Sequence, residues 1–128
     1  MGYKAMVIDD DKRTADFLAD QIRLLGHTVK TGYGPRAALS QIIFDVPDVL
    51  FLDINMPGID GLEVCRFLRR DVRTSNLRII VVSANEEKAY QDAAIEAGAN
   101  YYIVKPAMME DIENALSLVM GPEHQAKD

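Results

Sequence analysis

Residues 50–64, LFLDINMPGIDGLEV, pass from a short apolar run through a loop of turn-forming residues into a helical pattern. The apolar run at 49–52 is typical of a strand that is buried on both faces. Residues 53–61 are rich in turn formers, and apolar residues recur at helical spacing from Leu62 onward. The segment therefore predicts a buried strand, a loop and a helix in succession.

The same alternation of strand and helix patterns continues along the rest of the chain. Gly26 and Gly98 stand where two helices need a left-handed C-terminal residue, and Pro35 suits the first turn of another helix. Alternation of this kind implies parallel strands joined by right-handed crossovers, with helices on both faces of the sheet. We therefore expect an α/β fold, a doubly wound (βα)5 three-layer sandwich. The expected strands are residues 5–8, 27–31 (the weakest pattern), 49–52, 79–82 and 102–104, and helical spacing covers residues 17–25, 38–43, 62–68, 93–97 and 112–119.

Length and composition favour one ordinary globular domain. The chain has 128 residues, of which 48% are hydrophobic and 27% charged. We expect residues 1–121 to form the domain and residues 122–128 to form a polar C-terminal tail. The net charge of −6, with no cluster of lysine or arginine, argues against direct binding of nucleic acid. A single cysteine, and no apolar run near the roughly 18 residues that cross a bilayer, predict a cytoplasmic protein with no membrane contact.

Polar side chains follow four of the expected strands at the point where each strand ends. Asp9 and Asp10 follow the first strand and Asp53 follows the third. Ser83 follows the fourth strand and Lys105 the fifth. Because ligands of open parallel sheets bind at the carboxyl ends of the strands, we expect these residues to share one site.

The carboxylates of this group predict a Mg²⁺ site. Crowded Asp9, Asp10 and Asp53 side chains would repel one another, and Mg²⁺ binds a few carboxylates while keeping waters that a phosphate can displace. Taken singly, each aspartate is equally well explained as a turn residue or a helix N-cap, and Asp11 fits the N-cap role. The convergence of several aspartates with a hydroxyl and a lysine favours the metal site.

Asp53 and Lys105 suggest phosphoryl chemistry at this site. A carboxylate at the start of a loop can attack phosphorus and form an acyl phosphate, and a lysine ammonium stabilises phosphoryl oxygens. The backbone carbonyl of Asn55 is available as a further metal ligand. The alternative for Lys105 is a solvated lysine at a strand end. The Lys105-Pro106 bond is a candidate for the cis isomer, which occurs at about 5–6% of such bonds.

The loop residues have their own simpler interpretation. Pro57, Gly58 and Gly61 are explained as turn chemistry alone, which we prefer for all three.

Four motifs together resemble the receiver domain of two-component response regulators. They are VIDDD (7–11), LFLDINMPGIDGLEV (50–64), VVSAN (81–85) and YYIVKP (101–106). The resemblance extends from Lys4 to about Met120 and is closest in kind to the chemotaxis receivers. It implies a flavodoxin-like sheet with strand order 2-1-3-4-5.

The resemblance also implies roles for the clustered residues. Asp53 matches the phosphoacceptor, which takes its phosphoryl group from a phosphohistidine of a sensor histidine kinase or phosphotransfer protein. Asp10 matches the direct Mg²⁺ ligand, Asp9 the ligand that acts through water, and the Asn55 carbonyl completes the set. Such a domain is not an enzyme in the usual sense, since it catalyses only its own phosphorylation and dephosphorylation.

Further matched positions concern the conformational switch. Ser83 matches the switch hydroxyl, Lys105 the active-site lysine and Tyr102 the aromatic switch residue. Tyr102 is also explained as a strand-end aromatic with a solvated hydroxyl. The family signals to an output domain or target protein through the face formed by the fourth helix, the fifth strand and the fifth helix.

The sequence departs from the family pattern in places. Ala107 stands where the family often has phenylalanine, which predicts different packing before the last helix. Residues 109–114 are acidic and lack the arginines of the winged-helix regulators' dimers, so we do not expect such a dimer. Asn55 and Asn85 lie two residues beyond Asp53 and Ser83, where the family tunes dephosphorylation.

Two alternative functions are a phosphohydrolase and a scaffold without phosphoryl chemistry. A Mg²⁺-dependent phosphohydrolase of small phosphate esters would use the same carboxylates, but the position two residues after Asp53 is not a second aspartate, and no cap insertion is present. A degenerate receiver that serves only as a scaffold is disfavoured because every charged member of the group is present.

Overall fold

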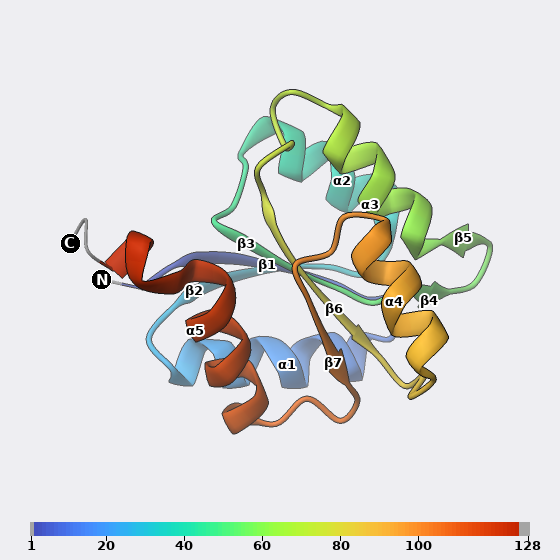
Figure 1. Cartoon of the computed structure of the whole chain (residues 1–128). Coiled ribbons are helices and arrows are strands. Elements are labelled where there is room, and N and C mark those ends of the chain that lie inside the picture. The colour runs from blue at the N-terminus through green and yellow to red at the C-terminus, as the bar shows by residue number, and fades with distance from the viewer. Residues whose placement is uncertain (1, 126–128) are drawn as a thin grey trace.

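The computed structural model describes residues 2–125 as a three-layer α/β sandwich (Figure 1). A five-stranded parallel sheet has the order β2-β1-β3-β6-β7. Numbered among these strands alone, the order is 2-1-3-4-5, so the predicted fold and strand order are confirmed. The strands are β1 (Lys4–Ile8), β2 (Thr28–Gly32), β3 (Val49–Leu52), β6 (Arg78–Ser83) and β7 (Tyr101–Val104). The helices are α1 (Lys12–Leu24), α2 (Pro35–Phe44), α3 (Gly61–Arg70), α4 (Lys88–Glu96) and α5 (Met109–Gln125).

Two apolar layers hold the sheet between the helices. In Figure 1, α1 and α5 cover one face, and α2, α3 and α4 cover the other. Alternate residues of β3 feed the two layers, because Leu50 and Leu52 pack toward α2 and α3 while Phe51 packs toward α1 and α5. All four residues of β3 are buried, which explains why its sequence reads as one apolar run. By contrast, β2 is an edge strand with exposed positions, and its sequence pattern was accordingly the weakest.

The predicted helix boundaries are confirmed by their backbone geometry. Asp11 caps α1, its side chain accepting hydrogen bonds from the N–H groups of Arg13 and Thr14. Gly26 and Gly98 have φ values of 99° and 117°, the left-handed region that favours glycine. Pro35 is the first residue of α2.

The last helix is interrupted near the C-terminus. Gly121 has φ 67° and ψ 174°, which breaks the helical geometry within α5. Residues 126–128 of the predicted tail lie outside the described residues, so the boundary at residue 121 stays a prediction. No helix within residues 2–125 is long and apolar enough to cross a bilayer. The cytoplasmic location stays a prediction.

The loop after β3 is more ordered than the sequence suggested. It contains a small antiparallel hairpin of β4 (Asn55–Met56) and β5 (Ile59–Asp60), with Gly58 at φ 73° in its turn. The turn interpretation is therefore right for Gly58, but it is wrong for Gly61. Gly61 belongs to α3, and a Cβ added there would lie 2.3 Å from the Ile54 Cα. This close approach lets α3 start directly behind the loop that carries Asp53.

Candidate functional site

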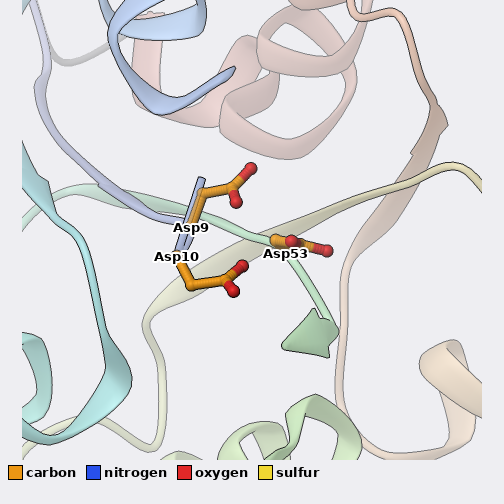
Figure 2. A group of neighbouring side chains, drawn as sticks. All are labelled: Asp9, Asp10 and Asp53. Atoms are coloured by element: carbon orange, nitrogen blue, oxygen red, sulfur yellow. The ribbon is translucent and has the colours of Figure 1, made fainter. Parts of the chain in front are cut away.

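Strand register brings Asp9 and Asp53 side by side at the carboxyl end of the sheet. Ile8 of β1 pairs with Leu52 of β3, and the Asp53 N–H donates to the Ile8 carbonyl at 2.9 Å. The residues that follow these two strands must therefore be neighbours. One carboxylate oxygen from each of Asp9, Asp10 and Asp53 lies within 4.8 Å of the others, as Figure 2 illustrates.

The charge of this cluster is only partly balanced. Asp9 and Asp53 are buried, with 2% and 6% of their surface exposed, whereas Asp10 is exposed. Lys105 Nζ lies 3.1 Å from Asp9 Oδ2 and 3.5 Å from Asp53 Oδ2. Burial raises the pKa of the Asp9 carboxyl, although the Asp11 N–H and Lys105 act in the opposite direction. Three carboxylates beside one ammonium leave a negative excess that suits a divalent cation with oxygen ligands.

Ser83 and Lys105 reach the same end of the sheet from β6 and β7. Ser83 pairs with Val104, and the Lys105 N–H donates to the Ser83 carbonyl at 2.8 Å. Ser83 is fully buried, and its Oγ accepts hydrogen bonds from Asn55 Nδ2 at 2.7 Å and from the Asn85 N–H at 3.1 Å. Both acceptor positions of this hydroxyl are thus used, and its own proton remains available to donate.

Asn55 and Tyr102 also lie at this site. The Asn55 N–H donates to Asp53 Oδ1 at 3.0 Å, so the backbone of β4 is held against the central carboxylate. Tyr102 is half-buried, and its hydroxyl donates to the Asn85 carbonyl at 2.8 Å. The structure therefore brings together Asp9, Asp10, Asp53, Asn55, Ser83 and Lys105. Tyr102 is linked to them through Asn85, which gives its hydroxyl a protein partner rather than a purely solvated end.

A family model described as the response regulator receiver domain matches residues 5–117. The chain belongs to the response-regulator receiver domains. The chain is therefore a receiver domain of two-component signalling, as the four motifs suggested.

Individual relatives agree with this assignment. Response regulator MprA of Mycobacterium ulcerans (strain Agy99) is 37% identical over 112 residues, covering 88% of this chain and 47% of that protein. The receiver thus spans about half the length of this relative. A proposed response regulator from Chloroflexus aurantiacus J-10-fl superposes with a TM-score of 0.87 and 30% identity, covering 94% of this chain and 98% of that one. Chemotaxis protein CheY4 of Vibrio cholerae, with a TM-score of 0.86, 23% identity and coverage of 93% and 99%, supports the fold alone.

The segment after β7 differs from the usual receiver pattern at Ala107. The Lys105-Pro106 peptide bond is cis, the isomer that the sequence left undecided. Ala107 is buried, and its carbonyl accepts a hydrogen bond from Gln21 Nε2 at 2.7 Å. A pocket of about 280 Å³ opens beside Ala107 and is bordered by the exposed ring of Phe17. Whether this packing differs from that of receivers with phenylalanine at this position stays a prediction.

Two residues near the site were missed by sequence reasoning. Gln21 is a polar residue on the apolar face of α1, between Leu18 and Ile22, and that mismatch was a readable signal. Tyr90 donates its hydroxyl to Asn55 Oδ1 at 3.1 Å. Nothing in its sequence surroundings marks this contact, because it depends on how α4 packs against β4.

Proposed function

We propose that the receiver accepts a phosphoryl group onto Asp53 from a phosphohistidine of a sensor histidine kinase or phosphotransfer protein. The observation that carries the proposal is the placement of Asp53, buried at the end of β3 between two other carboxylates and the Lys105 ammonium. An Asp53 oxygen attacks phosphorus, the bond from phosphorus to the imidazole nitrogen breaks, and the electron pair stays on that nitrogen. The protein contributes mainly position and charge.

The donor set fits Mg²⁺. Asp9, Asp10 and Asp53 supply clustered carboxylate oxygens, and the Asn55 carbonyl is the proposed backbone ligand. When bound, the cation supplies charge neutralisation for the phosphoryl oxygens. Lys105 Nζ lies 3.5 Å from Asp53 Oδ2 and would add a positive charge that stabilises the phosphoryl oxygens.

Ser83 and Tyr102 connect this chemistry to a partner surface. A phosphoryl group adds about −1.5 to −2 charges and three acceptor oxygens, which attract the free proton of the Ser83 hydroxyl. Movement of Ser83 disturbs its bond to the Asn85 N–H, and the carbonyl of the same Asn85 holds Tyr102. The change thus reaches β7, and with it the face of α4, β7 and α5 through which we propose that an output domain or target protein is contacted.

Chemical phosphorylation tests the proposal without a cognate kinase. The purified protein is incubated with acetyl phosphate or phosphoramidate and Mg²⁺, and its intact mass is measured. We expect one added phosphoryl group that hydroxylamine removes, and none with EDTA or in Asp53→Asn. Asp60→Asn is the matched control, because it changes another aspartate of the same loop whose role is to cap α3 through the Leu62 N–H. Full labelling of Asp53→Asn would contradict the assignment.

The same samples discriminate against the phosphohydrolase alternative. Asn55 stands two residues after Asp53, where a second carboxylate would serve as acid and base, and its side chain is bonded to Ser83 and Tyr90. We therefore expect no steady turnover of a generic phosphate ester. Multiple turnovers per protein would favour the hydrolase.

A further inference from the structure

Tyr90 contacts the proposed switch from α4. It lies in the first turn of that helix, is half-buried, and packs against the apolar layer formed with α2 and α3. Figure 1 shows the start of α4 beside β4. The contact is specific, because the Tyr90 hydroxyl donates to Asn55 Oδ1 at 3.1 Å.

The Asn55 side chain is exposed, and this hydrogen bond favours one orientation of its amide. An asparagine side chain has one acceptor oxygen and one donor NH₂ group on opposite sides. Because Oδ1 accepts from Tyr90, Nδ2 is directed away from it, toward Ser83 Oγ at 2.7 Å. The Asn55 backbone is held separately by its N–H bond to Asp53 Oδ1. Removal of the Tyr90 hydroxyl alone would therefore free the amide without freeing the backbone.

The orientation of Asn55 matters for Ser83. The Ser83 Oγ accepts from Asn55 Nδ2, and its burial excludes solvent as a substitute partner. A shift of the Ser83 side chain toward a phosphoryl group on Asp53 would change the geometry of this bond. The two hydrogen bonds that link Tyr90 to Asn55 and Asn55 to Ser83 thus stabilise the position of Ser83 in the unphosphorylated protein.

We propose that Tyr90 is a positioning residue of the switch, which orients the Asn55 amide and thereby holds Ser83 in its unphosphorylated position. The inference rests on the proposed function, since it concerns the state that phosphorylation of Asp53 must displace. A tyrosine hydroxyl keeps its proton at neutral pH and can donate a hydrogen bond. The hydroxyl is therefore a donor under the conditions in which the switch operates.

The first test uses a phosphoryl analogue, beryllium fluoride with Mg²⁺. Its dissociation constant is measured for the unaltered protein, Tyr90→Phe, Asn55→Ala and the double variant. The Tyr90 hydrogen bond stabilises the protein without the analogue, so its loss in Tyr90→Phe should lower the dissociation constant by about two- to tenfold. In the Asn55→Ala background, the same substitution should have no further effect, because the hydroxyl acts only through that amide.

Tyr101→Phe is the control, since Tyr101 lies at the opposite end of β7 and the change removes the same atom. It should leave the constant unchanged. Unchanged or weaker binding by Tyr90→Phe, or an equal effect with and without Asn55, would overturn the inference. If the unaltered protein neither binds the analogue nor takes up phosphate, the proposed function fails instead, so the two failures are distinguishable.

A second measurement needs no phosphoryl chemistry. The side-chain NH₂ signals of Asn55 are followed by nitrogen-15 NMR in the unphosphorylated protein. In Tyr90→Phe, we expect these signals to shift and their hydrogens to exchange faster than in the unaltered protein and in Tyr101→Phe. A purely structural tyrosine would change thermal stability without changing these signals. Identical Asn55 signals with and without the Tyr90 hydroxyl would contradict the proposal.

Discussion

The two ends of the parallel sheet differ in how their polar side chains are paired. At the amino end, polar side chains satisfy the backbone: Asp48 Oδ2 accepts the Lys4 N–H at 2.7 Å, and Asn100 Oδ1 accepts the Ile79 N–H at 2.8 Å. At the carboxyl end, Asp9 and Asp53 face each other and share one lysine. The first arrangement closes the fold, whereas the second leaves charge available for a ligand.

This difference separates the residues that stabilise the protein from those that react. A side chain bonded to strand ends lowers the energy of the folded state, and its loss exposes unsatisfied groups. A buried carboxylate beside another carboxylate raises that energy unless a cation is present. Substitutions at the amino end should therefore change stability alone, and substitutions at the carboxyl end should change chemistry most.

The largest effect is expected for Lys105→Ala. Loss of the ammonium beside Asp53 removes a charge that stabilises the phosphoryl oxygens in the transition state, so the phosphorylation rate should fall by about 10²–10³-fold. The rate with phosphoramidate and Mg²⁺ measures this directly. Lys4→Ala is the matched control, because Lys4 lies at the amino end and pairs with Asp45 at the surface. An equal fall of the phosphorylation rate in Lys105→Ala and Lys4→Ala would contradict the proposal that only the carboxyl end takes part in the chemistry.

Arg69→Met should have the second largest effect, on stability alone. Its guanidinium donates to the Gly98 carbonyl and to Asn100 Oδ1, both at 2.9 Å, and so joins α3 to the turn before β7. We expect the free energy of unfolding, measured with urea, to fall by about 2 kcal/mol, because these acceptors lose a charged donor.

The phosphorylation rate of the folded Arg69→Met protein should stay the same. Arg70→Met offers the comparison, since Arg70 is the exposed neighbour on the same helix and should change stability little. A slower phosphorylation in Arg69→Met would show that the amino end also contributes to the chemistry.

The smallest expected effect is a gain of stability in Asp9→Asn. A carboxyl whose pKa is raised in the folded state binds its proton more tightly there, so the folded state loses stability as pH rises from the unfolded pKa through the folded one. Without Mg²⁺, Asp9→Asn should be more stable than the unaltered protein by about 1 kcal/mol at pH 7.

The pH dependence of this gain is its signature. The difference between Asp9→Asn and the unaltered protein should vanish below about pH 4 and grow as pH rises. Asp48→Asn at the amino end should show no such gain. The stability of each variant is measured by thermal unfolding across this pH range, with and without Mg²⁺. A stability gain in Asp9→Asn that does not change with pH would exclude repulsion between the carboxylates as its cause.

The strands and their common polar edge could be predicted from local patterns, whereas the strand order was predicted from the resemblance to receiver domains. Buried strands read as apolar runs, and parallel register carries the residue after each strand to the same edge, which placed Asp9 and Asp53 together. Other features depend on packing between distant elements. Gly61 is required by contact with Ile54, and the orientation of Asn55 depends on Tyr90 and Ser83. No pattern within one segment specifies such contacts.

The most direct measurement is the position of the modified residue. Sodium borohydride reduces an aspartyl phosphate to homoserine, which stays in the chain and is located by peptide mass spectrometry. After phosphorylation with phosphoramidate and Mg²⁺, we expect homoserine at position 53 alone. Homoserine at position 9 or 10, or an unmodified Asp53 in protein that carries a phosphoryl group, would contradict the account.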